Sequence, residues 1–454
     1  MTGRKAYADY KDSGVKWLGS IPAGWSVAPI KHVADLRTSN VDKKSYEGEK
    51  PVLLCNYTDV YYNDSIRADM DFMPATASES QIAAFTLRAG DTLITKDSET
   101  SDDIGLAAYV PESLDEVVCG YHLAVYRPRD VRYGAFIKRF FDSKYAKSLL
   151  DVSAQGVTRV GLGQSALKNL LLPVPPVEEA VAIASYLDHE TAEIDAFIAD
   201  QEDLIELLIE RRSATITQAV TKGLNLTVPM KDSGSLWLGK VPDAWHVSRL
   251  TRYFDVVLGK MLDAGKEKHP DAEMLPYIRA ANIQDSGLEL SDVNSMPFTA
   301  AEAANLSIRS GDLLVVEGGS IGTSYLVPQN MDGWSFQKTV NRVRSKGVSL
   351  TSFLQYVLRS YRDAGILGML CNGSTIAHLT AEKLLNLVIP MPSPQEQGDI
   401  VAYLDRETAE IDAAIADAKE AIELSKERRA ALISAAVTGK IDVRNHITAE
   451  LGAA

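Results

Sequence analysis

The sequence predicts an α+β protein in which two mixed α/β domains form a pseudo-two-fold repeat, separated by two long antiparallel helices that form a coiled coil. Three observations predict this fold class. A segment at the head of the chain recurs after 220 residues, a helical segment recurs after 217 residues, and the stretches between these copies are rich in short strands. An internal repeat of this kind indicates the architecture of the whole chain.

Composition is that of a globular protein. The 454 residues are 46% hydrophobic and 24% charged, and the length suggests about three domains of roughly 150 residues. The chain starts without the apolar core of a signal peptide, and no stretch is long and apolar enough to span a membrane. Cys55, Cys119 and Cys371 lie far apart without a CxxC pair. We therefore expect neither a disulfide framework nor a structural zinc site, and a cytoplasmic location.

The net charge of −14 argues against nucleic-acid binding only at first sight. Residues 176–224 contain 3 Lys/Arg against 11 Asp/Glu, and residues 393–441 contain 6 against 10. Residues 26–170 contain 17 against 20, and residues 246–389 contain 14 against 14. The acidic residues are therefore concentrated in two segments. Each of the two near-neutral middle segments can still have a local basic face.

The heads of the two halves are near copies. KDSGVKWLGSIPAGW and KDSGSLWLGKVPDAW align so that Trp17 matches Trp237 and Trp25 matches Trp245. The middles diverge, although an Arg-x-Gly-Asp fragment (88–91 and 309–312) occurs in both. β-Branched and aromatic runs predict strands in the same order in each middle, followed by a helix. The expected strands are 51–57, 91–96, 117–128 and 170–175, then 275–283, 312–317, 338–345 and 387–392; the expected helices are 133–152 and 351–370.

The duplicated helical segment is the longest match, with 24 identities in the 37 positions of residues 185–221 and 402–438. Apolar and small residues recur at alternating steps of four and three, which indicates a coiled-coil seam. The seam residues are Leu187, Thr191, Ile194, Ile198, Gln201, Ile205 and Leu208, then Leu404, Thr408, Ile411, Ile415, Ala418, Ile422 and Ser425. The alternative is that each helix lies separately on a globular core.

Capping residues mark the ends of these helices. Ser393, Pro394 and Glu396 favour a helix start, and Gly223 favours a helix end. We expect helices within 176–224 and 393–441, and a helix of about 35–45 residues is roughly 50–65 Å long. The domains are then residues 1–175 and 225–392, followed by a C-terminal tail over 442–454.

No catalytic motif is complete. GSLWLGKV from Gly234 lacks the final hydroxyl of a phosphate-binding loop, and GGSIG around Ser320 precedes a predicted strand where a nucleophile elbow needs a helix. GLGQSA from Gly161 is a loose glycine pattern without a clear preceding strand. The histidines have no metal-ligand spacing. The sequence therefore predicts a protein that is not an enzyme, with no catalytic and no metal-binding residues.

The duplicated order of these segments resembles the specificity subunit of type I restriction–modification enzymes. The resemblance covers nearly the whole chain and rests on KDSG…WLG…IP…W, GDLLVVEGGSIG, and LPVPP or IPMPSPQEQ leading into YLD…ETAEID. It implies two target recognition domains that each read one half of a split, asymmetric double-stranded DNA target, with the helices as spacer. It also implies two methyltransferase (modification) subunits and restriction subunits as partners. S-adenosylmethionine, ATP and Mg would belong to those partners, and this chain would hold no cofactor.

Candidate DNA contacts are cationic, amide and hydroxyl residues expected in loops or at strand ends. The candidates are Arg37, Lys43, Lys44, Lys96, Arg127 and Arg159 in the first domain, and Lys260, Lys266, Lys268, Arg279, Asn282, Lys338, Arg342 and Ser374 in the second. Two other functions stay open: a self-sufficient DNA methyltransferase with its own reader, and a coiled-coil scaffold that does not bind DNA.

Overall fold

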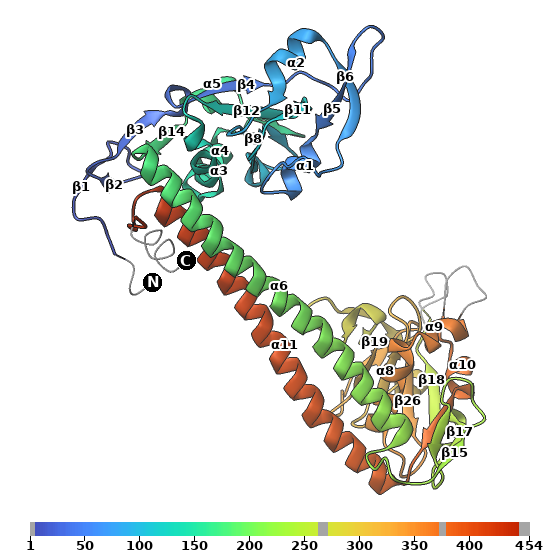
Figure 1. Ribbon diagram of the computed structural model, residues 1–454. Helices are drawn as coiled ribbons and strands as arrows, with labels where there is room; N and C mark the ends of the chain where they lie inside the picture. The colour runs from blue at the N-terminus through green and yellow to red at the C-terminus, as the bar shows by residue number, and fades with distance from the viewer. Residues whose placement is uncertain (1–4, 262–270, 372–377, 445–454) are drawn as a thin grey trace. The chain divides into compact units, whose positions relative to one another are not determined.

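The computed structural model describes residues 5–261, 271–371 and 378–444. The described chain forms two compact units. Unit 1 contains the residues up to Gln201 together with those from Glu420 onward, and unit 2 contains Glu202–Lys419. Each unit thus combines the head and middle of one repeat with parts of both long helices (Figure 1). Among the described helices, none combines the length and the apolar character needed to cross a membrane.

Unit 1 has three layers. An antiparallel sheet in the order β10-β8-β12-β4 lies in the middle. Ile94 of β8 packs with Phe136 and Phe140 of the helical layer, while its neighbour Leu93 packs with Val117 of a second sheet, β6-β5-β11-β7. The elements are β4 (Ala34–Thr38), β5 (Lys50–Cys55), β6 (Met73–Ala77), β7 (Thr86–Leu87), β8 (Thr92–Thr95), β10 (Ala107–Tyr109), β11 (Leu114–Cys119), β12 (Leu123–Pro128), α3 (Gly134–Asp142) and α4 (Lys144–Ser153).

Unit 2 repeats these layers. Its sheets have the orders β18-β26-β23-β24 and β22-β19-β25, and Val315 and Leu314 of β23 face the helical layer and the second sheet respectively. The elements are β18 (Phe254–Leu258), β19 (Glu273–Ile278), β22 (Asn294–Phe298), β23 (Leu313–Val316), β24 (Ser324–Leu326), β25 (Ser335–Phe336), β26 (Val340–Ser345), α8 (Thr351–Asp363) and α9 (Ile366–Cys371).

Shorter elements complete each unit. The two heads form the hairpins β1–β2 and β15–β16, and the strands that lead into the long helices pair back with the heads as β14–β3 and β27–β17. The bounds are β1 (Tyr10–Asp12), β2 (Ser20–Pro22), β3 (Ser26–Pro29), α1 (Tyr57–Tyr62), α2 (Glu79–Phe85), β9 (Asp97–Ser98), β13 (Val160–Gly161), α5 (Gln164–Asn169), β14 (Leu171–Val174), β15 (Met230–Asp232), β16 (Lys240–Pro242), β17 (His246–Arg249), β20 (Ile283–Gln284), β21 (Gly287–Leu288), α7 (Ala300–Asn305), α10 (Ala381–Asn386) and β27 (Val388–Met391).

Several expected elements are interrupted. The segment expected as one strand over 117–128 is β11 and β12, because a turn at Gly120, where Leu123 N–H donates to the Gly120 carbonyl at 3.0 Å, separates them. The helix expected over 133–152 is α3 and α4, because Ser143 is extended and its hydroxyl accepts from Ala146 N–H to cap a new helix. Likewise, α8 and α9 divide the helix expected over 351–370.

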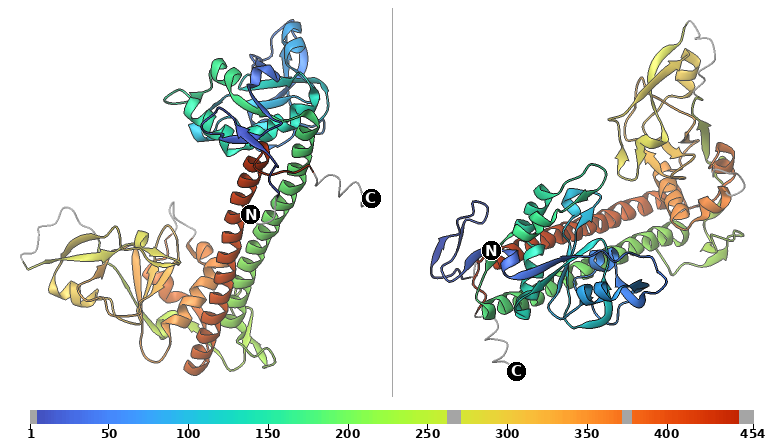
Figure 2. Two further views of the ribbon diagram at one scale, coloured as in Figure 1. Left: turned by 90° about the vertical axis from the view of Figure 1, so that its left-hand side faces the viewer. Right: turned by 90° about the horizontal axis from the view of Figure 1, so that it is seen from above.

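The long helices are α6 (Val177–Lys222) and α11 (Pro394–Val437). Figures 1 and 2 show them side by side and antiparallel within each unit. All 14 seam residues predicted from the sequence are buried or half-buried. Ion pairs flank the seam, with Asp195 to Arg429 at 2.9 Å in unit 1, and Arg212 to Asp412 in unit 2. The predicted antiparallel coiled coil is therefore confirmed in preference to helices that lie separately.

The helix ends meet the two heads in matching ways. Gly223, with φ +74°, ends α6, and a Cβ there would lie 3.2 Å from the buried ring of Trp245. Gly439, with φ +70°, follows α11 and lies against Pro22 and Trp25. Glycine is favoured at both positions by its left-handed backbone and by the tight space. Consequently, the end of α11 packs against the head of unit 1, and the end of α6 packs against the head of unit 2.

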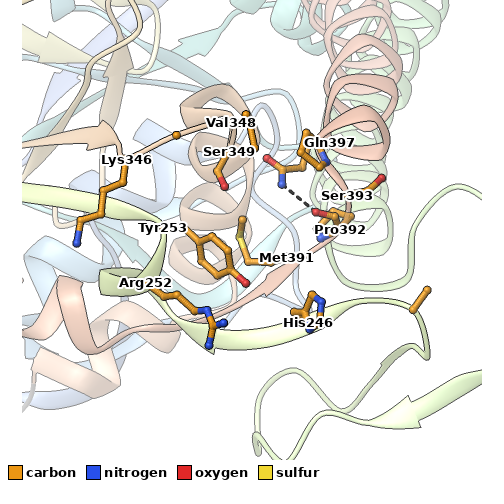
Figure 3. A pocket seen from close by; sticks show the side chains of 13 residues that line it. His246, Arg252, Tyr253, Lys346, Val348, Ser349, Met391, Pro392, Ser393 and Gln397 are labelled. Atoms are coloured by element: carbon orange, nitrogen blue, oxygen red, sulfur yellow. Dashed lines mark hydrogen bonds between the residues drawn. The ribbon is translucent and has the colours of Figure 1, made fainter.

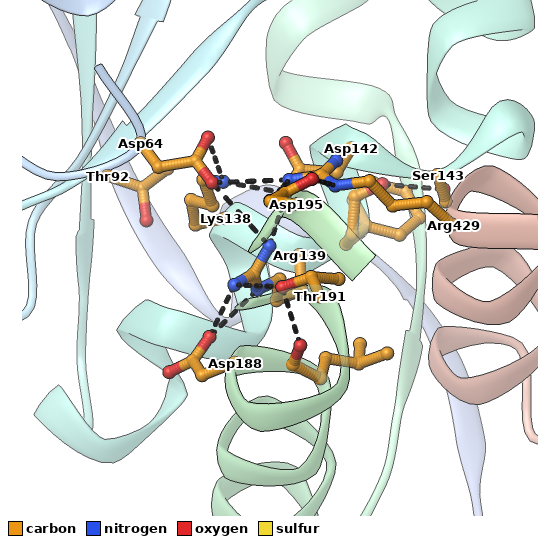
Figure 4. Close-up of polar contacts among 12 residues, drawn as sticks. Asp64, Thr92, Lys138, Arg139, Asp142, Ser143, Asp188, Thr191, Asp195 and Arg429 are labelled. Atoms are coloured by element: carbon orange, nitrogen blue, oxygen red, sulfur yellow. Dashed lines mark hydrogen bonds and ion pairs between the residues drawn. The ribbon is translucent and has the colours of Figure 1, made fainter. Parts of the chain in front are cut away.

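A buried arginine joins α3 to α6 in unit 1 (Figure 4). Arg139, only 7% exposed, donates to Asp188 at 2.6 and 2.9 Å and to Thr191 at 3.3 Å. Unit 2 makes the matching contact with a neutral donor, because the Tyr356 hydroxyl donates to Asp405 at 2.7 Å. The two units thus attach their helical layers at the same place with different side chains.

A second part of this cluster surrounds Asp64. Lys138 lies 2.8 Å from both Asp64 and Asp142. Burial alone would raise the pKa of Asp64, but Lys138, Arg139 and Arg429 together hold it below its ordinary value. A depressed folded-state pKa stabilises the protein above the ordinary value near 4, and this contribution is lost as the pH falls through the folded-state pKa.

We predict that Asp188→Asn destabilises the attachment of α3 by about 2 kcal/mol, because it leaves the buried Arg139 guanidinium with fewer counter-charges. Asp405→Asn is the matched control. An amide still accepts the Tyr356 hydrogen bond, so a loss below about 1 kcal/mol is expected there. Hydrogen exchange of the α3 and α8 amides measures both effects. Equal protection losses in the two helices would contradict the assignment.

Candidate nucleic-acid interface

Matched backbone hydrogen bonds identify one equivalent edge in each unit. Gly120 N–H donates to the Cys55 carbonyl at 2.8 Å, and Gln337 N–H donates to the Ile278 carbonyl at 2.9 Å. These bonds join the ends of the parallel pairs β5–β11 and β19–β25. Two further matched bonds, from Lys96 to the residue 122 carbonyl and from Glu317 to the residue 339 carbonyl, measure 3.0 and 2.9 Å.

We call this edge the divergent end, because its backbone is equivalent in the two units whereas its side chains differ. In unit 1 it consists of residues 39–43, 56–62, 96–97, 120–122 and 159–161. In unit 2 it consists of residues 259–260, 279–280, 317 and 337–339. Through the matched bonds, residues 56, 57, 121 and 122 correspond to residues 279, 280, 338 and 339. Loops at one edge of a rigid sheet are where binding residues concentrate.

The repeated Arg-x-Gly-Asp fragment stabilises the sheet that carries this edge. Asp91 is fully buried and accepts from Arg127 at 2.6 and 2.8 Å. In unit 2, Asp312 accepts from Arg344 at 2.6 and 2.7 Å. A bidentate pair in this setting fixes neighbouring strands with a defined geometry. The repeated motif therefore has a structural role in both units.

Three of the predicted contacts in the first domain, Lys43, Lys96 and Arg159, come together at the divergent end of unit 1. Lys43 is exposed. Lys96 is half-buried, its ammonium donates to the Ser39 carbonyl at 3.1 Å, and burial lowers its pKa. Arg159 lies 2.5 Å from Asp97, which also contacts His122 at 2.9 Å.

Three more, Lys260, Arg279 and Lys338, come together at the divergent end of unit 2. The ammonium of Lys260 donates to the Pro297 carbonyl at 2.8 Å and pairs with Glu302. Arg279 pairs with Asp292, and Lys338 is exposed. Lys266, Lys268 and Ser374 lie outside the described residues.

The remaining candidates lie outside the residues that define the divergent ends. Lys44 is exposed next to Lys43. Arg37 donates to the Ala84 carbonyl at 2.8 Å, and Arg127 is engaged with Asp91. In unit 2, Arg342 is 5% exposed and donates to the carbonyls of Asn305 and Ser307, and Asn282 is buried with its amide bonded to the carbonyls of Glu289 and Asp292. Arg127, Arg342 and Asn282 therefore stabilise loops and strands of their own unit.

Sequence reasoning missed the aromatic residues of unit 1, among them Tyr57, Tyr121 and His122. They line a pocket of about 120 Å³ together with Asp42, Lys43, Asn56 and Gly120. Their aromatic side chains are the signal in the sequence that points to them, because aromatic rings also contact bases.

A larger pocket lies elsewhere in unit 2, at the start of α11 (Figure 3). It measures about 500 Å³ and its lining includes His246, Arg252, Lys346 and Gln397. The Gln397 amide donates to the Pro392 carbonyl at 2.9 Å. No Asp, Glu or Cys lines this pocket. Across the described parts of the chain, no three His, Cys, Asp or Glu side chains are grouped so that they could hold a metal ion.

Comparisons with known proteins point to one family. The family model described as type I restriction modification DNA specificity domain matches twice, at residues 22–207 and 242–424. The putative type I restriction enzyme MjaX specificity subunit of Methanocaldococcus jannaschii is 22% identical, over 96% of this chain and 98% of its own length. The EcoKI specificity subunit of Escherichia coli K12 is 22% identical over 65% of this chain and 62% of its own length.

Solved structures have the same fold. A chain from work on complex assembly and conformational transition of the type I R-M system aligns with a TM-score of 0.65 at 19% identity, covering 92% of this chain and 98% of the other. The HsdS subunit from Thermoanaerobacter tengcongensis aligns with a TM-score of 0.55 at 16% identity, covering 93% and 98%. Both likenesses extend over the two units and the long helices.

Proposed function

The chain belongs to the type I restriction–modification DNA specificity family, and on that premise we propose that each divergent end reads one half of a split, asymmetric DNA target. The chain is a DNA-recognition subunit and not itself an enzyme. Neither alternative, a methyltransferase with its own reader or a scaffold that does not bind DNA, is supported by this family membership.

One observation carries the proposal: an equivalent backbone edge presents different side chains in the two units. At matched positions, unit 1 has Tyr121 and His122 where unit 2 has Lys338 and Thr339. Base edges in the major groove present distinct patterns of donors, acceptors and methyl groups. Different side chains on one scaffold therefore favour different base sequences in the two halves.

Exposed lysines near these edges supply the phosphate contacts in this proposal. Lys43, Lys44 and Lys338 are exposed, so they can reach the DNA backbone without first breaking a buried ion pair. Phosphate contacts orient a protein on the duplex without reading its sequence. The acidic faces of α6 and α11, by contrast, are poor DNA surfaces.

Methylation and cleavage of DNA would require partner subunits. We propose that two methyltransferase subunits bind one chain, one for each half-site, and that restriction subunits join the full complex. Methylation of a base requires that the base leaves the stack, so each methyltransferase must be held beside its own half. S-adenosylmethionine, ATP and Mg are bound by these partners, and the paired helices set the distance between the halves. The complex acts in the cytoplasm.

Exchange of the first middle tests the proposed function. Replacing residues 26–170 by the corresponding segment of another family member should replace one half of the methylated target and leave the other half unchanged. The reciprocal exchange of residues 246–389 is the matched control and should change the other half. Methylation-site mapping in cells gives the readout. A change in both halves after a single exchange would contradict two independent readers.

The phosphate contacts have a separate signature. Lys43→Ala and Lys44→Ala should each reduce the slope of log K against log salt concentration by about 0.9, because each removes one counterion-releasing contact. Affinity should fall equally for target and non-target duplexes. Lys147→Ala, on the helical layer at α4, is the control and should leave the slope unchanged. An unchanged slope in both variants would remove these lysines from the interface.

A further inference from the structure

The divergent end of unit 1 carries a cluster of aromatic side chains. Tyr57 and Tyr61 stack with centroids 5.5 Å apart, and Tyr121 meets His122 edge-on at 4.7 Å. The rings of Tyr57 and His122 are 6.5 Å apart, so they connect the two pairs. Tyr62 and Tyr121 are 76% and 50% exposed. Large aromatic residues at a surface edge of this kind are typical of binding sites.

The turn between β11 and β12 holds Tyr121 at this surface. A Cβ on Gly120 would lie 2.7 Å from the Cys55 carbonyl oxygen, so glycine lets the turn approach the end of β5 closely. The Lys96 ammonium lies 4.7 Å from the centroid of the Tyr121 ring, a cation–π distance. The same ammonium donates to the Ser39 carbonyl. The cation–π contact therefore restrains the ring at this surface.

His122 is held in a similar way. Its Nδ1 lies 2.9 Å from Asp97, whose other carboxylate oxygen lies 2.5 Å from Arg159. Pre-ordered contact groups lose little entropy on binding, which favours affinity and specificity. The pocket of about 120 Å³ next to these rings is lined by Tyr57, Tyr121 and His122. It therefore presents aromatic side chains to any group that enters it.

Unit 2 has no aromatic side chains at the matched positions. Arg279, Ala280, Lys338 and Thr339 stand where unit 1 has Asn56, Tyr57, Tyr121 and His122. The difference lies at the edge that we assign to DNA recognition. Only unit 1 therefore carries an aromatic group at these matched positions, so such a group can read only one half of the target.

We propose that Tyr121, supported by Tyr57 and His122, is a specificity-determining residue of unit 1 that reads the 5-methyl group of a thymine in the major groove. This inference rests on the proposed function. Thymine presents a methyl group in the major groove beside its O4 acceptor, and apolar side chains recognise it by contact. The neighbouring Lys43 and Lys44 would hold the phosphate backbone while the ring meets the base.

The test removes that methyl group. The complete complex with its methyltransferase subunits is given duplexes of the mapped target in which one thymine at a time is replaced by uracil. At one position in one half, the replacement should weaken wild-type binding about fourfold, which corresponds to one buried methyl-sized group. With Tyr121→Ala the same replacement should have no further effect, while replacements in the other half behave as in wild type.

Matched variants separate the outcomes. Tyr121→Lys introduces the residue type that unit 2 carries at this position and should also abolish the thymine preference, whereas Lys338→Ala should leave it intact. The proposal is overturned if the thymine-to-uracil ratio is the same in wild type and both Tyr121 variants at every position. If the wild-type complex showed no sequence-specific binding at all, this result would instead contradict the proposed function itself. Circular dichroism of each variant verifies its fold.

Discussion

The seam between α6 and α11 is the interaction on which both units depend. Leu187 and Ile194 of α6 and Leu432 of α11 belong to the core of unit 1, and Ile216 of α6 and Leu404 of α11 belong to the core of unit 2. Neither unit can complete its core with one helix alone. Burial of such residues contributes on the order of 2 kcal/mol each, so the pairing of the helices and the folding of the units are coupled.

This coupling leaves the divergent end of each unit free to vary. The helical layers use matched positions on the long helices, Asp188 and Asp405, and the central sheets use the buried carboxylates Asp91 and Asp312. With the backbone fixed in this way, residues in the loops beyond the strands can change without cost to the core. Two readers with different side chains can therefore share one scaffold, as a split asymmetric target requires.

The repeat, the fold class and the seam could be predicted because the residue patterns behind them are periodic and occur twice in the sequence. The division of 117–128 into two strands could not, since the interruption depends on how closely Gly120 approaches Cys55 in space. Nor could the packing of Gly439 against Pro22 and Trp25, because it joins segments that are far apart in the sequence. Among the candidate contacts, chemistry alone could not separate exposed Lys43 from Arg127, because only the fold shows that Asp91 already engages the arginine.

The proposed function depends on contact of the two divergent ends with different halves of one target. Site-specific photo-crosslinking tests it most directly, with a photoreactive amino acid placed at Tyr121, at Lys338 or, as a control, at the exposed Glu210 of α6, in the assembled complex on its mapped duplex. We expect crosslinks from position 121 to bases of one half, from position 338 to bases of the other half, and none from position 210. Crosslinks from positions 121 and 338 to the same half would contradict it.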